Sequence, residues 1–193
     1  RPRHHLRRFD QGQRGVQPGA DAAPVRRAVT PRNAIALADL TPNNLGQLRM
    51  LNAKLFPIAY SEQVYKDVLG EDVRPVCKLG LYNDIPVANV CCRVDEGKDV
   101  AHCKVYIMTL GVLPAYRHLG IGSALLRQVL EHAPPGGKYD DLRKVEAVYL
   151  HVHTGNEAAK QFYEQFGFHV TETVPDYYKK LEPRSAWLLE KRA

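Results

Sequence analysis

Apolar side chains recur along residues 34–174 with two different spacings, which together predict a mixed α/β domain. Alternating or continuous apolar runs predict strands over residues 34–40, 76–82, 85–94, 103–113, 145–152 and 168–174. Spacings of three and four residues predict helices over residues 41–55, 61–70, 114–133 and 156–167. The apolar run over residues 105–108 is typical of a central strand that is covered on both faces. We therefore expect a central mixed sheet flanked by helices.

Capping residues set the expected ends of the helices. Thr41, which precedes a proline, is expected to cap the first helix, and Ser61 and Asn156 are expected to cap the second and fourth. Gly70 and Gly167 stand where a residue in the left-handed conformation often ends a helix.

Turn residues set the expected ends of two strands. Asn83 and Asp84 lie between two apolar runs and predict the tight turn of a hairpin. Pro86 follows closely and cannot donate a ladder hydrogen bond, so we expect it at a strand end or a sheet edge.

Length and composition narrow the class of protein. The chain has 193 residues, of which 45% are hydrophobic and 25% charged, as in ordinary globular domains and unlike disordered or fibrous chains. In the motif-bearing region the longest run without a charged residue, 105–116, covers 12 residues and includes a proline. A helix needs about 20 apolar residues to cross a bilayer, so we expect no membrane span. We also expect no secretory signal.

The net charge of +6 is carried by the first 33 residues, which contain eight arginines and two aspartates. Residues 34–193 are therefore neutral overall, and the charge does not mark the domain as a nucleic-acid binder. The apolar residues of 1–33 follow neither the helical nor the strand spacing. We therefore expect a disordered basic extension ahead of one domain over 34–193. A transit peptide, an arm that contacts RNA or an acidic partner, and an extension without a specific role all stay open.

The four cysteines form no CxxC pair and lack the paired spacing of a zinc site. We expect buried, reduced thiols in an intracellular protein, with a cytoplasmic and also nuclear location. These residues are Cys77, Cys91, Cys92 and Cys103.

Residues 110–123, Leu-Gly-Val-Leu-Pro-Ala-Tyr-Arg-His-Leu-Gly-Ile-Gly-Ser, join the predicted central strand to a helix through a basic turn with two glycines. Backbone amides at a helix N-terminus bind anions, and glycines let a phosphate approach the main chain. Arg117 and His118 add donors, so a pyrophosphate fits this turn. The Walker pattern GxxxxGKS/T and the third glycine of the dinucleotide fingerprint are both missing. A tight loop whose glycines only satisfy steric needs stays an alternative.

Arg117, Gly120 and Gly122 resemble the Q/R-x-x-G-x-G/A acetyl-CoA signature of the GNAT acyltransferase superfamily, and residues 156–168 resemble the second half of its CoA site. Further segments resemble the catalytic subunit of NatE-type N-terminal acetyltransferases, namely 56–60 (Phe-Pro-Ile-Ala-Tyr), 106–111, 149–152 and 177–183. The resemblance covers about residues 34–185. It implies the GNAT fold, acetyl-CoA as cosubstrate and no metal. It places CoA against Leu110, Val112, Arg117, His118, Gly120, Ile121, Gly122, Ser123, Asn156 and Tyr163.

The resemblance also implies the chemistry. It assigns Tyr106 and His151, on neighbouring strands, to deprotonating the incoming amine through an ordered water. The acetyl group passes directly from thioester to amine, with backbone amides near residues 108–110 polarising the carbonyl. An α-ammonium has a pKa near 7.7 to 8.0, which a histidine near 6.5 deprotonates adequately at neutral pH. As residues of apolar strands alone, Tyr106 and His151 are equally typical of a hydrogen-bonded core.

The acceptor site is the third implication. Two aromatic segments match family positions that enclose an initiator methionine, and we expect peptides that start with Met and an apolar residue. A helix stop at Phe56 and an edge strand at Tyr177 are the purely structural alternatives. The implied acceptor residues are Phe56, Pro57, Ile58, Tyr60, Met108, Tyr177, Tyr178 and Leu181.

The family further implies association with the auxiliary and catalytic subunits of the NatA complex and with the ribosome, where the basic extension would find anionic partners. Two other functions stay open. One is acetylation of lysine ε-amines, and the other is a non-catalytic scaffold subunit of the NatA/NatE complex.

Overall fold

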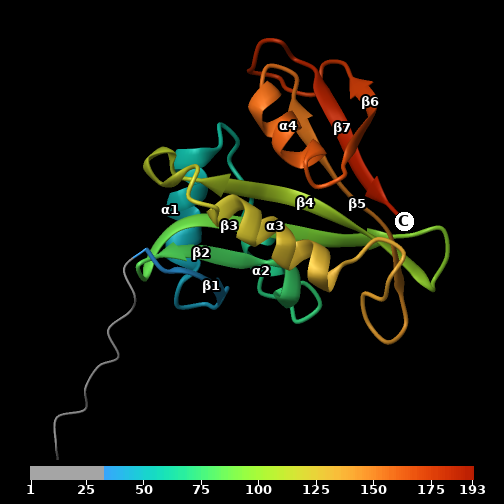
Figure 1. Cartoon of the computed structure of the whole chain (residues 1–193), viewed down its shortest axis with the longest axis horizontal. Coiled ribbons are helices and arrows are strands. Elements are labelled where there is room, and N and C mark those ends of the chain that lie inside the picture. The colour runs from blue at the N-terminus through green and yellow to red at the C-terminus, as the bar shows by residue number, and fades with distance from the viewer. Residues whose placement is uncertain (1–32) are drawn as a thin grey trace, which may run out of the picture.

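A twisted sheet runs through the described part of the chain and carries helices on both faces (Figure 1). The structure is a computed structural model that describes residues 33–193. The predicted basic extension, apart from Asn33, lies outside the described residues. The strands are β1 (Ile35–Asp39), β2 (Lys78–Tyr82), β3 (Ile85–Glu96), β4 (His102–Val112), β5 (Lys144–His153), β6 (His169–Val174) and β7 (Ala186–Arg192).

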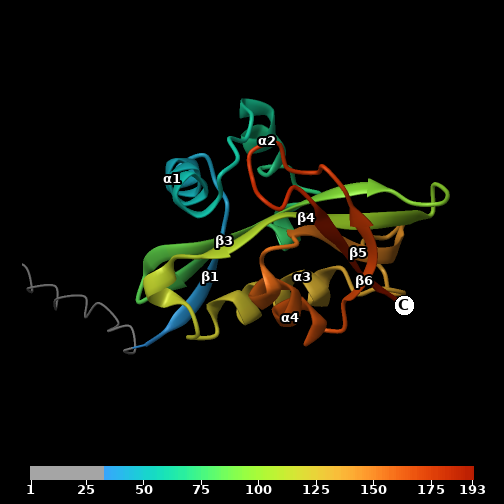
Figure 2. The same ribbon diagram turned by 90° about the horizontal axis from the view of Figure 1, so that it is seen from above.

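The helices lie in two layers. Figure 2 shows α1 and α2 on one side of the sheet and α3 and α4 on the other. The α-helices are α1 (Leu45–Leu55), α2 (Glu62–Asp67), α3 (Ile121–His132) and α4 (Glu157–Glu164), and two 3₁₀ turns are η1 (Arg74–Val76) and η2 (Pro114–Tyr116). This arrangement confirms the predicted mixed sheet flanked by helices.

The sheet order is β1-β2-β3-β4-β5-β7-β6, and β4 with β5 is its parallel pair. A parallel pair needs a crossover, which α3 supplies. The parallel ladder ends at the pair formed by Tyr106 and Tyr149. Beyond it, β4 continues along β3 while β5 continues along β7. The two central strands therefore separate, and one edge of β4 is left without its neighbour from Ile107 onward.

The central strand β4 is covered unequally on its two faces. Val105, Ile107 and Thr109 are buried, whereas Tyr106 and Met108 are half-buried. The predicted central position is confirmed, but the prediction that both faces are fully covered is wrong. The half-buried residues line a cavity.

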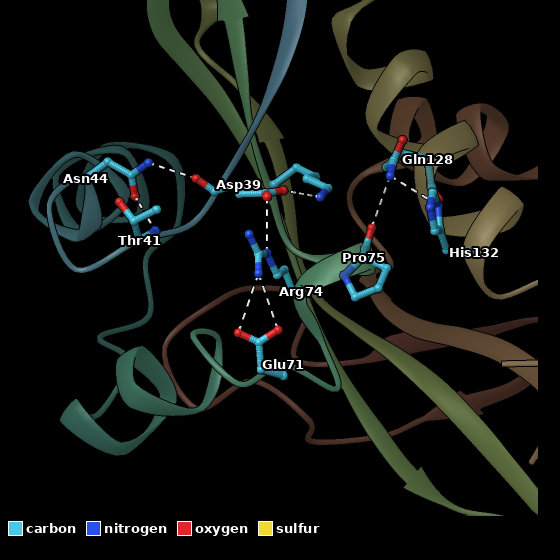
Figure 3. Close-up of polar contacts among 9 residues, drawn as sticks. Asp39, Thr41, Asn44, Glu71, Arg74, Pro75, Gln128 and His132 are labelled. Atoms are coloured by element: carbon cyan, nitrogen blue, oxygen red, sulfur yellow. Dashed lines mark hydrogen bonds and ion pairs between the residues drawn. The ribbon is translucent and has the colours of Figure 1, made fainter. Parts of the chain in front are cut away.

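The start of the first helix differs from the prediction (Figure 3). The N-cap is Asn44 rather than Thr41, and α1 starts at Leu45. The Asn44 amide group donates to the Asp39 carbonyl at 2.9 Å and accepts from the Thr41 amide at 2.8 Å. These bonds hold residues 41–44 in a turn that precedes the helix.

Of the other predicted helix ends, two N-caps and one C-terminal glycine are confirmed. The Ser61 hydroxyl accepts from the Val64 amide, and the Asn156 side chain accepts from the Ala159 amide, as expected of N-caps. Gly167 has the left-handed φ of 82° that was expected, whereas Gly70 is outside that region, so its prediction is wrong. The segment after α2 continues in helical turns instead.

The hairpin between β2 and β3 is confirmed. Asn83 and Asp84 have φ of 48° and 67°, as a type I′ turn requires. Pro86 lies near the start of β3, as expected of a residue that weakens a ladder.

The sequence prediction missed one strand. β7 lies between β5 and β6, so residues 168–174 are not the last strand as predicted. In β7 the buried residues Ala186 and Leu189 are three apart, and the strand ends in Glu190, Lys191 and Arg192. This sequence lacks the period of two by which strands are identified.

The core lies between the sheet and its helices, and the four cysteines belong to it as buried free thiols, as expected. Polar contacts tie both α3 and β1 to η1 (Figure 3). The Gln128 amide of α3 donates to the Pro75 carbonyl at 3.2 Å, and Arg74 pairs with Asp39 at the end of β1. The first contact holds α3 against η1, and the second holds η1 against β1.

Candidate functional site

Two adjoining cavities open where β4 and β5 separate. The first has a volume of about 390 Å³ and the second about 600 Å³. They share a wall formed by Leu110, Gly111, Arg117, Asn156, Ala159 and Tyr163. A molecule that occupies both would therefore pass over the free edge of β4.

The second cavity gathers every residue that was predicted to bind CoA. All ten line it, from β4, from the turn before α3, from the start of α3 and from α4. Phe162, which was not predicted, lines the same cavity. Its place on the apolar face of α4 is the feature of the sequence that could have indicated it. The structure thus brings the two halves of the predicted CoA motif together.

The turn before α3 has a conformation suited to an anion. Gly120 has a φ of 90° and His118 a φ of 63°, so the chain enters α3 through two left-handed residues. The Arg117 Nε donates to the Val112 carbonyl at 3.0 Å, which anchors the guanidinium beside β4. α3 then starts at Ile121, and its first amides point toward the turn.

An added side chain would affect the fold differently at Gly120 and at Gly122, the two glycines of the acetyl-CoA signature. A Cβ at Gly120 would be strained whatever the space, because that residue is left-handed. A Cβ at Gly122 would meet Val112 at 3.6 Å and Phe162 at 3.7 Å, which are ordinary contacts. Gly122 is therefore not required by the fold, and its position on the cavity wall points to a ligand that approaches closely.

The predicted catalytic residues contact each other. The Tyr106 hydroxyl lies 2.9 Å from Nδ1 of His151 and 3.3 Å from the Tyr177 hydroxyl. The Tyr177 ring stacks on the His151 ring with centroids 4.3 Å apart. Sequence reasoning assigned Tyr177 to the acceptor wall but not to this contact with His151.

Burial shifts both titrating groups of this pair toward their neutral forms. It raises the pKa of the Tyr106 hydroxyl far above its ordinary value, and the hydrogen bond with Tyr177 adds to the rise. Burial lowers the pKa of His151, aided by Arg93 and opposed by Glu172. At neutral pH, His151 is therefore a free base and Tyr106 keeps its proton.

A second group of residues surrounds the Tyr106 ring. The Arg93 guanidinium lies over that ring at 4.2 Å, and the Tyr149 ring lies 4.9 Å away. Asp95 accepts hydrogen bonds from both Arg93 and Tyr149. Sequence reasoning missed Arg93 and Asp95, because their neighbours across the strands are set by the register of the sheet.

The first cavity gathers all eight residues predicted to bind the acceptor, together with Tyr106 and His151. Met108 and Tyr106 come from β4 and His151 from β5, and the other residues come from two loops, residues 56–61 after α1 and residues 175–185 between β6 and β7. In Figure 2 the loop before β7, drawn in red, reaches across to the side of α1 and α2. Burial raises the pKa of both Tyr60 and Tyr178 to about 12, so these two side chains are uncharged at neutral pH.

Gly111 lets the first loop approach the central strand. A Cβ at Gly111 would lie 2.9 Å from the Phe56 ring and 3.0 Å from the Leu55 side chain. Sequence reasoning did not single out this glycine for that contact, although a glycine inside an apolar strand signals a close approach.

A chain of buried polar groups lies beneath the first cavity. The Thr109 hydroxyl donates to Asn89 at 2.7 Å, and the Asn89 amide donates to Asn52 at 3.0 Å. The Asn52 amide lies 3.4 Å from the Tyr65 hydroxyl. Asn52, Asn89 and Thr109 are each at most 3% exposed. This chain joins the end of α1, and hence the loop that carries Phe56, to β3 and β4.

We expect Asn89→Ala to lower the free energy of unfolding by about 1 to 3 kcal/mol, because it leaves buried groups of Asn52 and Thr109 without their partner. Urea denaturation measures this change. Asn43→Ala, at an exposed turn position, is the matched control and should change stability by less than about 0.5 kcal/mol. Equal midpoints for the two variants would show that the polar chain does not stabilise the fold.

Within residues 33–193, no helix is long and apolar enough to cross a membrane. The same residues contain no group of three histidine, cysteine or acidic side chains placed to hold a metal ion.

The chain is similar to several acetyltransferases. Residues 45–168 match the acetyltransferase (GNAT) family. The chain is 44% identical to N-alpha-acetyltransferase 50 of Danio rerio over 83% of its own length and 89% of the relative. It is 41% identical to the probable N-acetyltransferase san of Drosophila melanogaster, over 83% and 82% of the two chains.

The chain is also similar to a solved structure. Arabidopsis thaliana Naa50, in complex with the bisubstrate analogue CoA-Ac-MVNAL, superposes with a TM-score of 0.72 and 40% identity, over 82% of this chain and 99% of the other. With the seven-stranded sheet, the separated central strands and the paired cavities, these similarities show that the chain belongs to the GNAT acetyltransferase family.

Proposed function

We propose that this protein is an N-terminal acetyltransferase, which transfers acetyl from acetyl-CoA to the α-amine of peptides that start with Met and an apolar residue. The observation that carries the proposal is the pair of Tyr106 and His151 in the first cavity, beside the free edge of β4. The CoA motif lines one adjoining cavity, and aromatic residues line the other. Two relatives support this activity: N-alpha-acetyltransferase 50 of Danio rerio, which is 44% identical, and Naa50 of Arabidopsis thaliana, which is 40% identical.

The residues of the second cavity suit acetyl-CoA. The first amides of α3, Arg117 and His118 supply donors for the pyrophosphate, and Gly122 leaves the close approach open. Acetyl-CoA supplies the acetyl thioester, whose carbonyl carbon the free amine attacks and whose sulfur leaves as the thiol. Main-chain amides near residues 108–110, on the edge of β4 from which β5 has separated, polarise that carbonyl.

The geometry suggests the path of the proton. With Nδ1 of His151 unprotonated, the Tyr106 hydroxyl donates to it at 2.9 Å and passes its proton to His151. Tyr106 takes a proton from an ordered water in the same step, and that water takes one from the ammonium. His151 is the final acceptor because its lowered pKa leaves it unprotonated at neutral pH. Tyr177, stacked on His151, holds the ring in place.

The same chemistry disfavours the lysine alternative. A lysine ammonium has a reference pKa of about 10.4, so presenting it as a free amine costs about 3.5 kcal/mol more than for an α-amine. The scaffold alternative is disfavoured because Tyr106, His151 and the signature residues are all present in the cavities. Association with NatA subunits and ribosomes, and a cytoplasmic and nuclear location, stay predictions.

Acceptor choice tests the proposal. We expect Met-Leu peptides to exceed Ser- or Asp-starting peptides by at least about tenfold in kcat/KM, because burying one methionine side chain is worth about 1.5 to 3 kcal/mol. Phe56→Ala should remove most of that preference by widening the cavity beside Gly111. Steady-state acetylation of peptides that differ in the first two residues measures both effects.

Lys138→Ala, at an exposed position outside both cavities, is the control and should keep the preference. Equal rates on Met-, Ser- and Asp-starting peptides would contradict the proposed acceptor. Faster acetylation of a lysine in an N-terminally blocked peptide would favour the lysine alternative.

A further inference from the structure

A third hollow, which we call the outer groove, adjoins the acceptor cavity. It has a volume of about 330 Å³. Five of its residues also line the acceptor cavity, so the two spaces are continuous. The outer groove is lined by Pro57, Ile58, Ala59, Tyr177, Tyr178, Lys179, Lys180 and Leu181.

The position of the outer groove suits the chain that follows the acceptor amine. With the amine at Tyr106 and His151, and the first side chain against Phe56, the peptide leaves between the same two loops that form the groove. An extended chain advances about 3.3 to 3.6 Å per residue, so its later residues pass along the outer groove. Ile58 and Tyr177, which are 47% and 40% exposed, offer apolar surface near the entrance.

The charge of the outer groove is one-sided. Among residues 33–193, no aspartate or glutamate lines either the outer groove or the acceptor cavity, whereas Lys179 and Lys180 both line the groove. Among the ion pairs of residues 33–193, none involves either lysine, although ten pairs of other residues use lysine or arginine. On the same loop Glu182 is paired with Arg184, and Asp176 does not line the groove.

We propose that Lys179 and Lys180 select acceptor peptides that carry an aspartate or glutamate at the third to fifth position. This inference rests on the proposed N-terminal acetyltransferase function and adds a second element of specificity to it. The first cavity recognises the apolar first residue, and the two ammonium groups attract a carboxylate further along the chain. Because both lysines are exposed, salt screens the attraction, and its effect is on association more than on the chemical step.

Peptides that differ by one isosteric change test the inference. The series starts Met-Leu, continues with Gly and Ala, and carries a single Glu or Gln at position three, four or five. At low salt we expect kcat/KM for the best Glu peptide to exceed that of its Gln partner by about three- to tenfold, mostly through KM. At 0.5 M salt the ratio should approach one.

The variant Lys179→Gln/Lys180→Gln should lose the preference for Glu at low salt and keep its rate on Gln peptides. Lys98→Gln/Lys138→Gln removes the same charge at exposed positions outside the outer groove and should keep the preference. Equal rates on Glu and Gln peptides, or a preference that persists in Lys179→Gln/Lys180→Gln, would overturn this inference alone. Failure to acetylate any Met-Leu peptide would overturn the proposed function and this inference together.

Discussion

The variant Gly122→Glu should lose acetyl-CoA binding while it stays folded. A side chain at residue 122 extends into the second cavity, where its nearest neighbours would be Val112 and Phe162 at ordinary contact distances. The fold therefore tolerates the substitution, but a carboxylate there meets the pyrophosphate that Arg117 and His118 are proposed to bind. Like charges in contact at an interface cost several kcal/mol, so we expect affinity to fall by at least about a hundredfold.

Calorimetric titration with CoA measures the affinity, and circular dichroism with thermal unfolding shows whether the variant is folded. Gly46→Glu is the matched control, because Gly46 is an exposed residue of α1 and, apart from its chain neighbours and its own helix backbone, no atom of residues 33–193 lies within 4 Å of an added Cβ. It should bind CoA like the unmodified protein. Wild-type affinity in a folded Gly122→Glu protein would show that the turn before α3 is not the phosphate site.

Features that depend on neighbouring residues were predictable from the sequence. The turn at Asn83 and Asp84, the cap at Asn156 and the left-handed Gly167 each follow from local backbone chemistry, and the structure confirms them. The N-cap of the first helix was mispredicted because Thr41 and Asn44 are both residue types that cap helices. Asn44 bonds back to β1 through Asp39, a contact that requires knowledge of where β1 lies.

Features that depend on strand register were not predictable. Arg93 and Tyr149 approach Tyr106 only because β3 and β5 are the neighbours of β4 in this register. β7 was missed because its buried residues do not alternate, and yet it separates β5 from β6. Asn89 was not predicted either, although a polar residue inside an apolar run of a strand needs a buried partner.

The separation of β4 and β5 links the fold to the proposed chemistry. In the described part of the chain, one edge of β4 from Ile107 onward has no strand paired to it, and that same edge lies between the two cavities. Tyr106 is the last β4 residue of the parallel ladder, and His151 lies just beyond the end of that ladder on β5. The fold thus places the proposed proton acceptor beside the point where β4 and β5 separate.

We expect Tyr106→Phe and His151→Ala each to lower kcat by about ten- to a thousandfold, as is typical for loss of general-base catalysis. CoA affinity should change little, because both residues line the first cavity and neither lines the second. Steady-state kinetics with a Met-Leu peptide and calorimetry with CoA separate these effects. His169→Ala, at an exposed position at the start of β6, is the matched histidine control and should keep normal turnover.

The pH dependence of kcat/KM distinguishes a base from a residue that only supports the cavity. Burial lowers the pKa of His151 below its ordinary value of 6.5, so its free base is present above that pKa and is lost as the pH falls through it. The peptide amine is mainly the ammonium below its pKa near 7.7 to 8.0. Because His151 takes the proton of that ammonium, log kcat/KM should rise with a slope of one through the pKa of His151 and stay level from there to the amine pKa. His151→Ala has to use free amine from solution, so its plot should keep a slope of one up to the amine pKa. A level region below the amine pKa in that variant, or near-normal turnover in both variants, would rule out the proposed proton path.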